Sequence, residues 1–447
     1  MVVARRTLLG AGLAAVGAAV TGCGEPPRDH TATWVPPDGT PAGTAPATPN
    51  PTTTPSPSAS PSPPGQAAYA ADVTKTLRRY LPEGAQTLRH DGFPGAVALV
   101  LVDGHATVHT AVGEALRYDA GPKLLPAGRR VPMRPDSVFD LASVTKVYTT
   151  ILLLQQVDKG RVELAAPVAD YLPGFTGAGK DAVTVAMLLT HTSGLPVGAK
   201  VTGLPDDAAR WKAVLASPLV SGAVPGRTFR YSSVGLMVAG KIVERVTGQR
   251  LDLALKTGLT GPLGLRDTGF LPKTWLSSGA RSTRLVATDA RSSRGLLRGT
   301  VHDDVANHLG GVAGHAGVFA SAADVAAIGQ LLLDGGVYQG RRILAEATVR
   351  RMLTDANTGK PAVDPERPTR TSAHGLGVVL NQRWFMGRLS SARTFGHTGF
   401  AGPSLLVDPD RRLVLALLTN RAHPNWSWAD PDPARVAVAD VLARAVG

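Results

Sequence analysis

Apolar runs separated by turn residues predict β-strands near both ends of the folded part of the chain. Residues 93–115 hold two such runs around Asp103-Gly104, a dipeptide that favours the tight turn of a β-hairpin. After Ala373 the strand pattern returns in three short runs, GLGVVL, PSLLVDPD and RRLVLALLTN. Because hairpin-connected strands run antiparallel, we expect an antiparallel sheet that draws strands from both regions.

Between and after these strands, apolar residues recur with the spacing of helices. The internal runs are VYTTILLLQQVDKG, VTVAMLLTHTSGLP, VGLMVAGKIVERVTG and AADVAAIGQLLLDGG, and the last run is ARVAVADVLARAV. Glycine follows three of the internal runs, at Gly160, Gly248 and Gly335, and glycine commonly terminates helices. Strands at both ends with helices between them predict an α+β fold, an antiparallel sheet flanked by helices with an inserted all-α subdomain.

The predicted folded domain spans residues 71–447. Its sheet-bearing part comprises residues 71–140 and 310–447, and its helical part comprises residues 141–309. Residues 24–70 are dominated by Pro, Thr, Ser, Ala and Gly. A segment of this composition cannot bury a core, so we expect a semi-extended, disordered tether in front of the domain.

The first 23 residues have the pattern of an export signal. A basic region with Arg5-Arg6 precedes an apolar run, and small residues lead to Val-Thr-Gly-Cys at residues 20–23. This ending resembles a bacterial lipobox, so we expect lipid attachment at Cys23. Arg5-Arg6 followed by Thr-Leu-Leu is also typical of a twin-arginine signal. The pattern predicts an exported protein anchored to the outer face of the cell membrane through Cys23.

Charge and cysteine content narrow the classes of function. The formal net charge is +13 and the pI is near 10.2, from 47 Lys and Arg against 34 Asp and Glu. The arginines are dispersed and form no basic stripe, so no nucleic-acid partner is expected. The excess positive charge either promotes solubility or attracts the protein to anionic lipid or cell-wall polymer. Cys23 is the only cysteine, which excludes an internal disulfide and a thiolate metal site.

The stretch FDLASVTKVYTT, residues 139–150, places Ser143 three positions before Lys146, where polar sequence turns apolar. At a helix start, the two side chains would lie on one face, one turn apart. The helix N-terminus and burial would then favour the neutral amine, which can take the serine proton. The alternative is a helix-capping serine with a surface lysine, and the motif alone does not separate the two.

Two further motifs follow along the chain. Tyr231 precedes an amphipathic helix in PGRTFRYSSVGL, with Ser233 two positions on, and His-Thr-Gly occupies residues 397–399 in TFGHTGFAG. With these motifs, residues 93–424 resemble the serine β-lactamase and penicillin-binding protein superfamily, and most closely its class C-like branch of D-alanyl-D-alanine carboxypeptidases and esterases. Other segments that carry the resemblance are FDLASVTK, LLTHTSGLP, FRYSSVGL, VHDDVANHLGGVAGHAGVFASAAD and LLTNRAHP.

The resemblance implies a β-lactamase/transpeptidase-like fold and a role for each motif residue. Ser143 would be the acylated nucleophile, with Lys146 and Tyr231 sharing the work of the general base. The backbone N–H groups of Ser143 and Phe400 would form the oxyanion hole. The implied substrate-binding residues are Ser233, His397, Thr398 and Gly399. No cofactor is implied.

Two of these positions depart from the stricter family pattern. Ser233 replaces an asparagine, and His397 replaces a lysine that holds the substrate carboxylate in many relatives. A histidine with a pKa of about 6.5 is mostly neutral at neutral pH, so it attracts a carboxylate less strongly. We therefore expect weaker recognition of β-lactams, and an activity that depends on the protonation of His397 in the physiological range.

Three histidines between glycines, His302, His308 and His315, raise the question of a metal site. Their spacing matches no His-Glu-x-x-His or comparable ligand pattern, so no metal is expected. The neighbouring Asp303 and Asp304 are expected to fix a loop by accepting hydrogen bonds, and not to act as catalytic carboxylates.

The leading prediction is an exported, lipid-anchored serine hydrolase that forms an acyl-enzyme at Ser143. Its substrate would be a D-Ala-D-Ala-type peptide of the cell wall or an ester. A class C-like β-lactamase is an alternative with the same chemistry, because the fold does not fix the substrate. A non-catalytic lipoprotein that binds cell-wall peptides is the alternative of another class, although the intact Ser143, Lys146 and Tyr231 argue against it.

Overall fold

The computed structural model describes residues 66–82, 92–364 and 370–446. The predicted export signal, the lipidation residue Cys23 and the tether up to residue 65 lie outside the described residues. In the described part of the chain, no helix combines the length and the apolar character needed to cross a bilayer.

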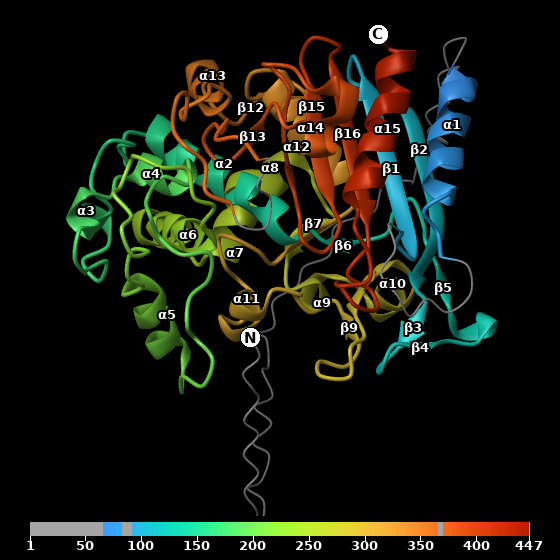
Figure 1. Cartoon of the computed structure of the whole chain (residues 1–447), viewed down its shortest axis with the longest axis horizontal. Helices are drawn as coiled ribbons and strands as arrows, with labels where there is room; N and C mark the ends of the chain where they lie inside the picture. The colour runs from blue at the N-terminus through green and yellow to red at the C-terminus, as the bar shows by residue number, and fades with distance from the viewer. Residues whose placement is uncertain (1–65, 83–91, 365–369, 447) are drawn as a thin grey trace, which may run out of the picture. The chain divides into compact units, whose positions relative to one another are not determined.

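A seven-stranded antiparallel sheet forms the centre of the described body (Figure 1). In spatial order its strands are β13 (Val379–Leu380), β14 (Phe395–Thr398), β15 (Ser404–Asp408), β16 (Leu413–Thr419), β1 (Gly95–Val102), β2 (His105–Leu116) and β5 (Val131–Pro132). The predicted hairpin of β1 and β2 turns at Asp103 and Gly104, whose φ angles are 48° and 78°. β1 also pairs with β16, so the predicted sheet with strands from both regions is confirmed.

Helices flank the sheet and build the body beside it (Figure 1). In chain order they are α1 (Gln66–Arg78), α2 (Thr145–Asp158), α3 (Val168–Tyr171), α4 (Val185–Leu189), α5 (Asp207–Leu215), α6 (Ser233–Thr247), α7 (Leu251–Leu255), α8 (Gly261–Leu263), α9 (Pro272–Trp275), α10 (Ser278–Arg284), α11 (Asp304–His308), α12 (Ala322–Leu333), α13 (Glu346–Met352), α14 (Arg383–Met386) and α15 (Asp432–Ala445). The helices α2, α6, α12 and α15 match the periodic runs. Gly160, Gly248 and Gly335 follow the first three of these with φ between 63° and 68°, the left-handed conformation that ends a helix.

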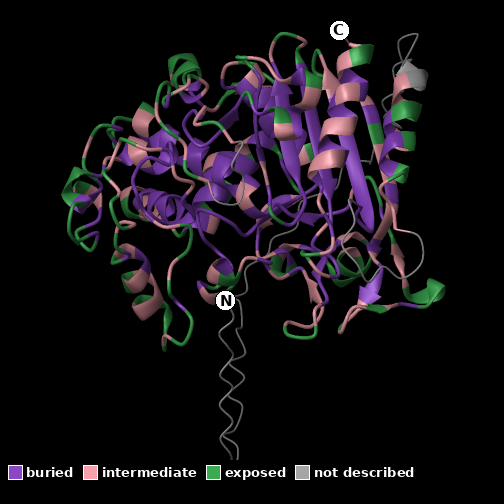
Figure 2. Ribbon diagram, in the orientation of Figure 1, coloured by how far each residue is buried: buried purple, intermediate pink, exposed green. Residues whose placement is uncertain are grey.

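The alternation along the central strands decides which helices cover each face of the sheet. On β1, Ala98 and Val100 belong to the apolar cluster that includes α1 and α15, whereas Val97 and Leu99 belong to the cluster that includes α12 and the helical part. The strands β1, β15 and β16 are therefore buried on both faces, as Figure 2 shows, while α1 and α15 expose their outer sides.

A second, three-stranded sheet consists of β6 (Phe139–Asp140), β10 (Val318–Ala320) and β7 (Thr268–Phe270). Because β7 lies inside residues 141–309, this part is mainly but not entirely helical. β6 leads directly into the turn that carries Ser143.

The helix predicted over residues 183–196 is shorter than the apolar pattern suggested. Only α4 forms there, and the chain then leaves the helix at Thr190. His191 takes a φ of 56°, a left-handed conformation that cannot continue a right-handed helix. Because the helix ends here, the His191 side chain turns toward Tyr231.

Candidate active site

The candidate nucleophile lies in a single 3₁₀ turn, Ala142–Val144, immediately before α2. Lys146, in the first turn of α2, is fully buried, and its Nζ lies 2.8 Å from Ser143 Oγ. The same Nζ donates to the carbonyl oxygen of His315 at 3.1 Å, which fixes the amine in place. The structure thus excludes the alternative of a surface lysine, and the geometry suits proton transfer between Ser143 and Lys146.

Asp140 stabilises this turn by accepting hydrogen bonds, a role that the sequence motif did not predict. Its Oδ1 accepts from the backbone N–H of Ala142 at 2.8 Å, and its Oδ2 accepts from that of His302 at 2.7 Å. Ala142 has a φ of 46°, a left-handed conformation that costs free energy for a residue with a Cβ. The buried carboxylate stabilises this conformation and so orients Ser143. Burial raises the pKa of Asp140.

The start of α6 places Tyr231 beside Lys146. Ser232 caps that helix, with its Oγ accepting from the N–H of Gly235 at 3.0 Å. The cap leaves Tyr231 just outside the helix, where Lys146 Nζ lies 5.1 Å from the centre of its ring. Ser233, the residue proposed to contact substrate, is the first residue of α6 and is largely buried.

A second cation lies beside Tyr231. The guanidinium carbon of Arg370 is 5.4 Å from the centre of the Tyr231 ring, and Arg370 pairs with Asp364 at 2.9 Å. Arg370 could not be predicted from the sequence, because it lies far from every motif along the chain. Its charge also acts on His397.

Three buried histidines, His191, His374 and His397, are called the histidine cluster here; the rings of His191 and His397 lie near that of Tyr231, and His374 packs against His191. The His191 ring lies 4.6 Å from that of Tyr231 and 4.9 Å from that of His374, between ring centres. His191 Nδ1 also accepts from the N–H of Ser232 at 3.1 Å. Burial lowers the pKa values of His191 and His374, so both stay neutral. Neither was predicted from the sequence.

His397 lies on β14 with Thr398, as the motif suggested, but its protonation differs from the expectation. Burial, and then the charge of Lys146, lower the pKa of His397 to about 3. Its Nδ1 donates to the carbonyl oxygen of Thr398 at 2.8 Å, which leaves Nε2 as an acceptor. The expected titration of His397 in the physiological range is therefore wrong: the ring is neutral there and offers no positive charge to a carboxylate.

Gly399 allows the end of β14 to approach the nucleophile turn. A Cβ at Gly399 would lie 2.3 Å from the carbonyl oxygen of Leu141, so any other residue would push the two segments apart. Ala142, Ala401 and Ala422 form a small apolar cluster across this contact. The contact brings the residue after Gly399 next to the turn of Ser143, as the predicted oxyanion hole requires.

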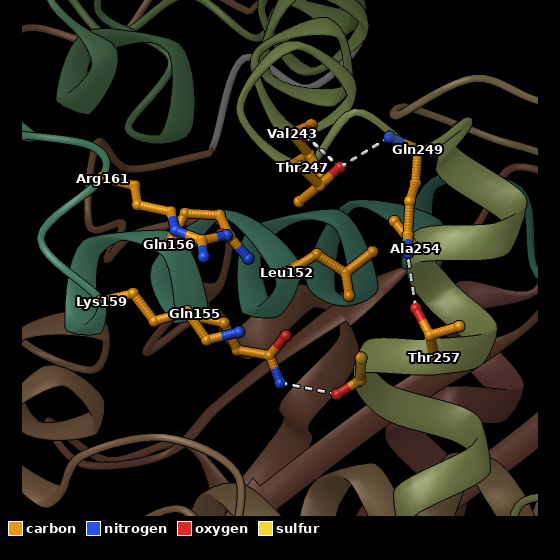
Figure 3. A pocket seen from close by; sticks show the side chains of 11 residues that line it. Leu152, Gln155, Gln156, Lys159, Arg161, Val243, Thr247, Gln249, Ala254 and Thr257 are labelled. Atoms are coloured by element: carbon orange, nitrogen blue, oxygen red, sulfur yellow. Dashed lines mark hydrogen bonds between the residues drawn. The ribbon is translucent and has the colours of Figure 1, made fainter.

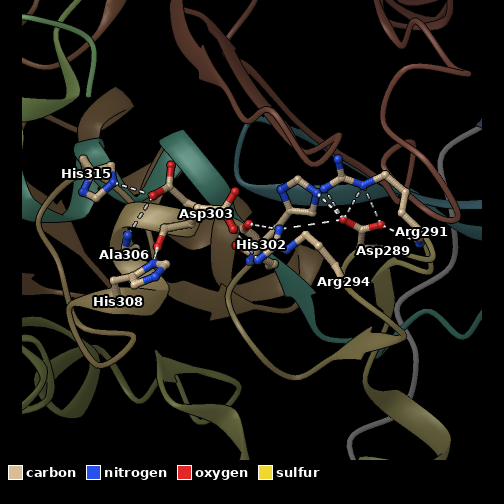
Figure 4. Close-up of polar contacts among 10 residues, drawn as sticks. Asp289, Arg291, Arg294, His302, Asp303, Ala306, His308 and His315 are labelled. Atoms are coloured by element: carbon tan, nitrogen blue, oxygen red, sulfur yellow. Dashed lines mark hydrogen bonds and ion pairs between the residues drawn. The ribbon is translucent and has the colours of Figure 1, made fainter. Parts of the chain in front are cut away.

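The loop before β10 carries the histidines that were considered as metal ligands (Figure 4). His315 Nε2 and Asp303 Oδ1 are 2.9 Å apart, and Asp303 Oδ1 also caps α11 at Ala306. His308 instead contacts the carbonyl oxygen of Asp304. Asp303 therefore fixes a loop, as expected. Within residues 66–82, 92–364 and 370–446, no three His, Cys, Asp or Glu side chains are arranged to hold a metal ion.

His302 faces away from the other two histidines, toward Asp289 (Figure 4). Arg291 makes a close ion pair with Asp289, with Nη2 2.6 Å from Oδ2, and Arg294 lies farther away at 3.7 Å. Burial opposes the ionisation of Asp289, but hydrogen bonds from His302 and Arg291 lower its pKa. The network holds the loop that carries the His302 N–H to Asp140.

A separate polar cavity lies between α2, α6 and the π-helical turn at Lys256–Thr260 (Figure 3). Its volume is about 190 Å³, and its walls include Gln155, Gln156 and Thr247. Gln155 Nε2 donates to the carbonyl oxygen of Gly258 at 2.8 Å and so closes one side. None of the candidate catalytic residues lines this cavity, so it is not part of the site around Ser143.

Comparison with known proteins is consistent with this geometry. A family model described as "Beta-lactamase" matches residues 85–440. An N-acetylmuramyl-L-alanine amidase of Bacillus subtilis (strain 168) is 32% identical over 380 residues, which cover 78% of this chain and 82% of that protein. A protein of Escherichia coli (strain K12) named as a D-alanyl-D-alanine carboxypeptidase is 29% identical over 392 residues, with coverages of 80% and 85%.

Solved structures show the same fold. A penicillin-binding protein homologue from Caulobacter crescentus superposes with a TM-score of 0.64 at 23% identity, covering 85% of this chain and 98% of that chain. A family VIII carboxylesterase superposes with a TM-score of 0.60 at 22% identity, covering 85% and 98%. These likenesses confirm the predicted antiparallel sheet flanked by helices.

Proposed function

The chain belongs to the β-lactamase family and is a hydrolase of the serine β-lactamase and penicillin-binding protein superfamily, and we propose that it cleaves amide or ester bonds of cell-wall peptides through an acyl-enzyme on Ser143. The observation that carries this proposal is the 2.8 Å contact between Ser143 Oγ and the buried Nζ of Lys146. A buried amine at this distance is suited to take the serine proton.

The proposed reaction has two steps. In the first, Ser143 Oγ attacks the substrate carbonyl carbon while its proton passes to Lys146, and the N–H groups of Ser143 and Phe400 stabilise the oxyanion. The tetrahedral intermediate then expels the amine or alcohol, which takes the proton. In the second step, water attacks the ester of Ser143 and gives up a proton to the Lys146 amine, directly or through the Tyr231 hydroxyl, which passes its own proton to Lys146 as it accepts the one from water. The acid product leaves and Ser143 regains its proton.

For the substrate, we favour acyl peptides ending in D-Ala-D-Ala and the related esters. The carboxypeptidase name of one relative and the esterase among the solved structures support this choice. A second candidate is the amide bond between an N-acetylmuramyl group and L-alanine, because the B. subtilis relative named as an amidase of that bond is 32% identical. The neutral His397 argues against tight binding of β-lactam carboxylates, so we rank a β-lactamase lower.

We further propose that the protein is exported and anchored to the outer face of the cell membrane through a lipid on Cys23. The basic, apolar and small-residue pattern that ends in Val-Thr-Gly-Cys supports this proposal. Replacing Cys23 by Ser should move the protein from the membrane fraction to the soluble fraction. An unchanged share in the membrane fraction would count against the lipid anchor.

A matched pair of substrates tests the proposed reaction. One is an N-acylated peptide ending in D-Ala-D-Ala, and the other is the same molecule with D-lactate in place of the last D-Ala. We expect the wild-type protein to release D-alanine from the first and D-lactate, faster, from the second, because an alcohol is the better leaving group. N-acetylmuramyl-L-alanine serves as the third substrate, for the second candidate.

Ser143→Ala should lose turnover of each substrate by several orders of magnitude, as expected for an activated nucleophile. Equal turnover by the wild type and Ser143→Ala would refute the assignment of Ser143. Binding of the peptides without any turnover by the wild type would favour the non-catalytic alternative.

A further inference from the structure

Phe400 and Trp426 form a pair of exposed aromatic rings, called the aromatic platform here. Their exposed fractions are 44% and 39%, and their ring centres are 5.5 Å apart. Within the described residues, every other Phe and Trp side chain is buried or half-buried. Because apolar rings left in water cost free energy, an exposed pair of this kind commonly marks a binding surface.

The platform lies next to the nucleophile turn. Phe400 directly follows Gly399, whose close contact with Leu141 was described above. On the side of the loop after β16, Ala422 belongs to the same small apolar cluster as Ala401 and as Ala142, the neighbour of Ser143. Trp426 belongs to the same loop. The platform therefore lies beside the predicted oxyanion hole and can contact whatever is attached to the substrate carbonyl.

Arg421 fixes the positions of the two segments that carry the platform. Its guanidinium carbon lies 4.3 Å from the centre of the Phe400 ring, and its Nε donates to the carbonyl oxygen of Phe400 at 2.6 Å. Its Nη1 donates to the carbonyl oxygen of Trp426, also at 2.6 Å. One side chain thus ties together the two segments that carry the rings, so the platform is formed before any substrate arrives.

The edges of the platform are polar. The ring of His302 lies 5.6 Å from that of Phe400, and the guanidinium carbon of Arg291 lies 6.0 Å from the centre of the Trp426 ring. Figure 4 shows that both of these side chains are directed at Asp289, which fixes their positions. Arg291, which is partly exposed, is therefore the polar group at the rim, whereas His302 is buried and turned toward Asp289.

Resting on the proposed function, we propose that the aromatic platform is a subsite for a pyranose ring carried next to the scissile carbonyl. A pyranose has an apolar C–H face, which suits stacking on aromatic rings, and hydroxyl or acetamido groups at its edge, which suit the polar rim. In an N-acetylmuramyl amide, the sugar is only a few bonds from the carbonyl. In a peptide ending in D-Ala-D-Ala, it is separated by several residues. The platform thus supports the muramyl amide, the second candidate substrate, which the names of the relatives placed behind the D-Ala-D-Ala peptides.

Binding to a catalytically inactive variant tests the subsite without depending on turnover. In the Ser143→Ala background, calorimetry would compare N-acetylmuramyl dipeptide with the same dipeptide carrying an acetyl group in place of the sugar. We expect the sugar to tighten binding about tenfold, a gain of the size given by burying one aromatic face.

Three further variants in the same background identify the surface responsible. Trp426→Ala should abolish the preference for the sugar, and Trp426→Phe should keep most of it because a flat ring remains. Leu253→Ala, at an exposed apolar residue of α7 that lies outside the platform, should not change the preference.

Equal binding of the two ligands, no measurable binding of either, or a preference that survives Trp426→Ala would overturn the proposal. A benzoyl-capped dipeptide that binds as tightly as the sugar ligand would also overturn it, since the platform would then be a general apolar acyl subsite. These outcomes are independent of the proposed reaction, which fails only if Ser143 of the wild type forms no acyl-enzyme.

Discussion

Two groups of rings lie near the turn of Ser143, and they differ in exposure and in partners. The histidine cluster next to Tyr231 is almost fully buried, with exposed fractions of 0 to 2%. The aromatic platform is open to solvent and is held by the Arg421 side chain, which donates to two backbone carbonyl oxygens. Burial keeps the rings of the histidine cluster neutral, so these side chains carry no positive charge next to Tyr231. The second group leaves apolar surface that a ligand can cover. On the proposals above, the buried rings would serve the chemistry and the exposed rings the choice of substrate.

The buried histidine cluster lowers the stability of the fold in a way that the exposed aromatic platform does not. Among the described residues, the Nε2 atoms of His191, His374 and His397 are buried without a hydrogen-bond partner. Each buried polar atom left unpaired costs about 1–3 kcal/mol. This free-energy cost accompanies the burial that keeps the rings of the histidine cluster neutral.

The largest change to this arrangement is expected from Gly399→Ala. A Cβ there collides with the backbone of Leu141, so β14 and the N–H of Phe400 must move away from Ser143. Loss of one oxyanion donor typically lowers kcat by about 10²–10³. The matched control is Gly198→Ala, where a Cβ meets nothing within 4 Å and φ is not left-handed. Esterase rates of the two variants, with circular dichroism as a check on folding, decide the point. Equal rates would show that the close approach is not needed.

A smaller effect is expected in the pH dependence of stability. The pKa values of His397 and His423 are both lowered by burial to about 3. Between that pH and about 6.5, the unfolded chain binds more protons than the folded protein, so stability falls as the pH falls. Each histidine contributes a slope of about 1.4 kcal/mol per pH unit in that window, and its contribution is fully present above it.

Urea unfolding at several pH values between 4.5 and 7.5 measures this slope. His397→Asn, which keeps a neutral polar group, should reduce the slope by about one histidine's contribution. The pH profile of activity should have the same shape in the wild type and in His397→Asn, because His397 does not titrate in the folded protein. An unchanged slope of stability would mean that His397 can be protonated in the folded protein.

Several parts of the fold and site followed from the sequence because they depend on local patterns. The hairpin of β1 and β2 and the helices α2 and α6 have clear periodicity and clear end signals. Ser143 and Lys146 are three positions apart at a helix start, so a shared face could be predicted from their spacing, although the motif alone left a surface lysine as an alternative.

Other parts could not be predicted, since they depend on contacts between distant residues. Asp140 and His302 are 162 positions apart, and nothing in either segment indicates that one will bond to the other. Arg370 reaches Tyr231 from a segment without a motif. The neutral state of His397 depends on its burial, which is a property of the packed protein and not of the His-Thr-Gly motif.

The most direct test of the account is the mass of the intact protein after reaction with a fluorophosphonate, followed by peptide mapping. We predict one adduct, on the peptide that contains Ser143, and none on the Ser143→Ala protein. Lys146→Ala should form the same adduct about 10²–10⁴ times more slowly, since it lacks the base. An adduct on a different residue, or an equal rate of labelling without Lys146, would contradict the assignment of Ser143 and Lys146 as nucleophile and base.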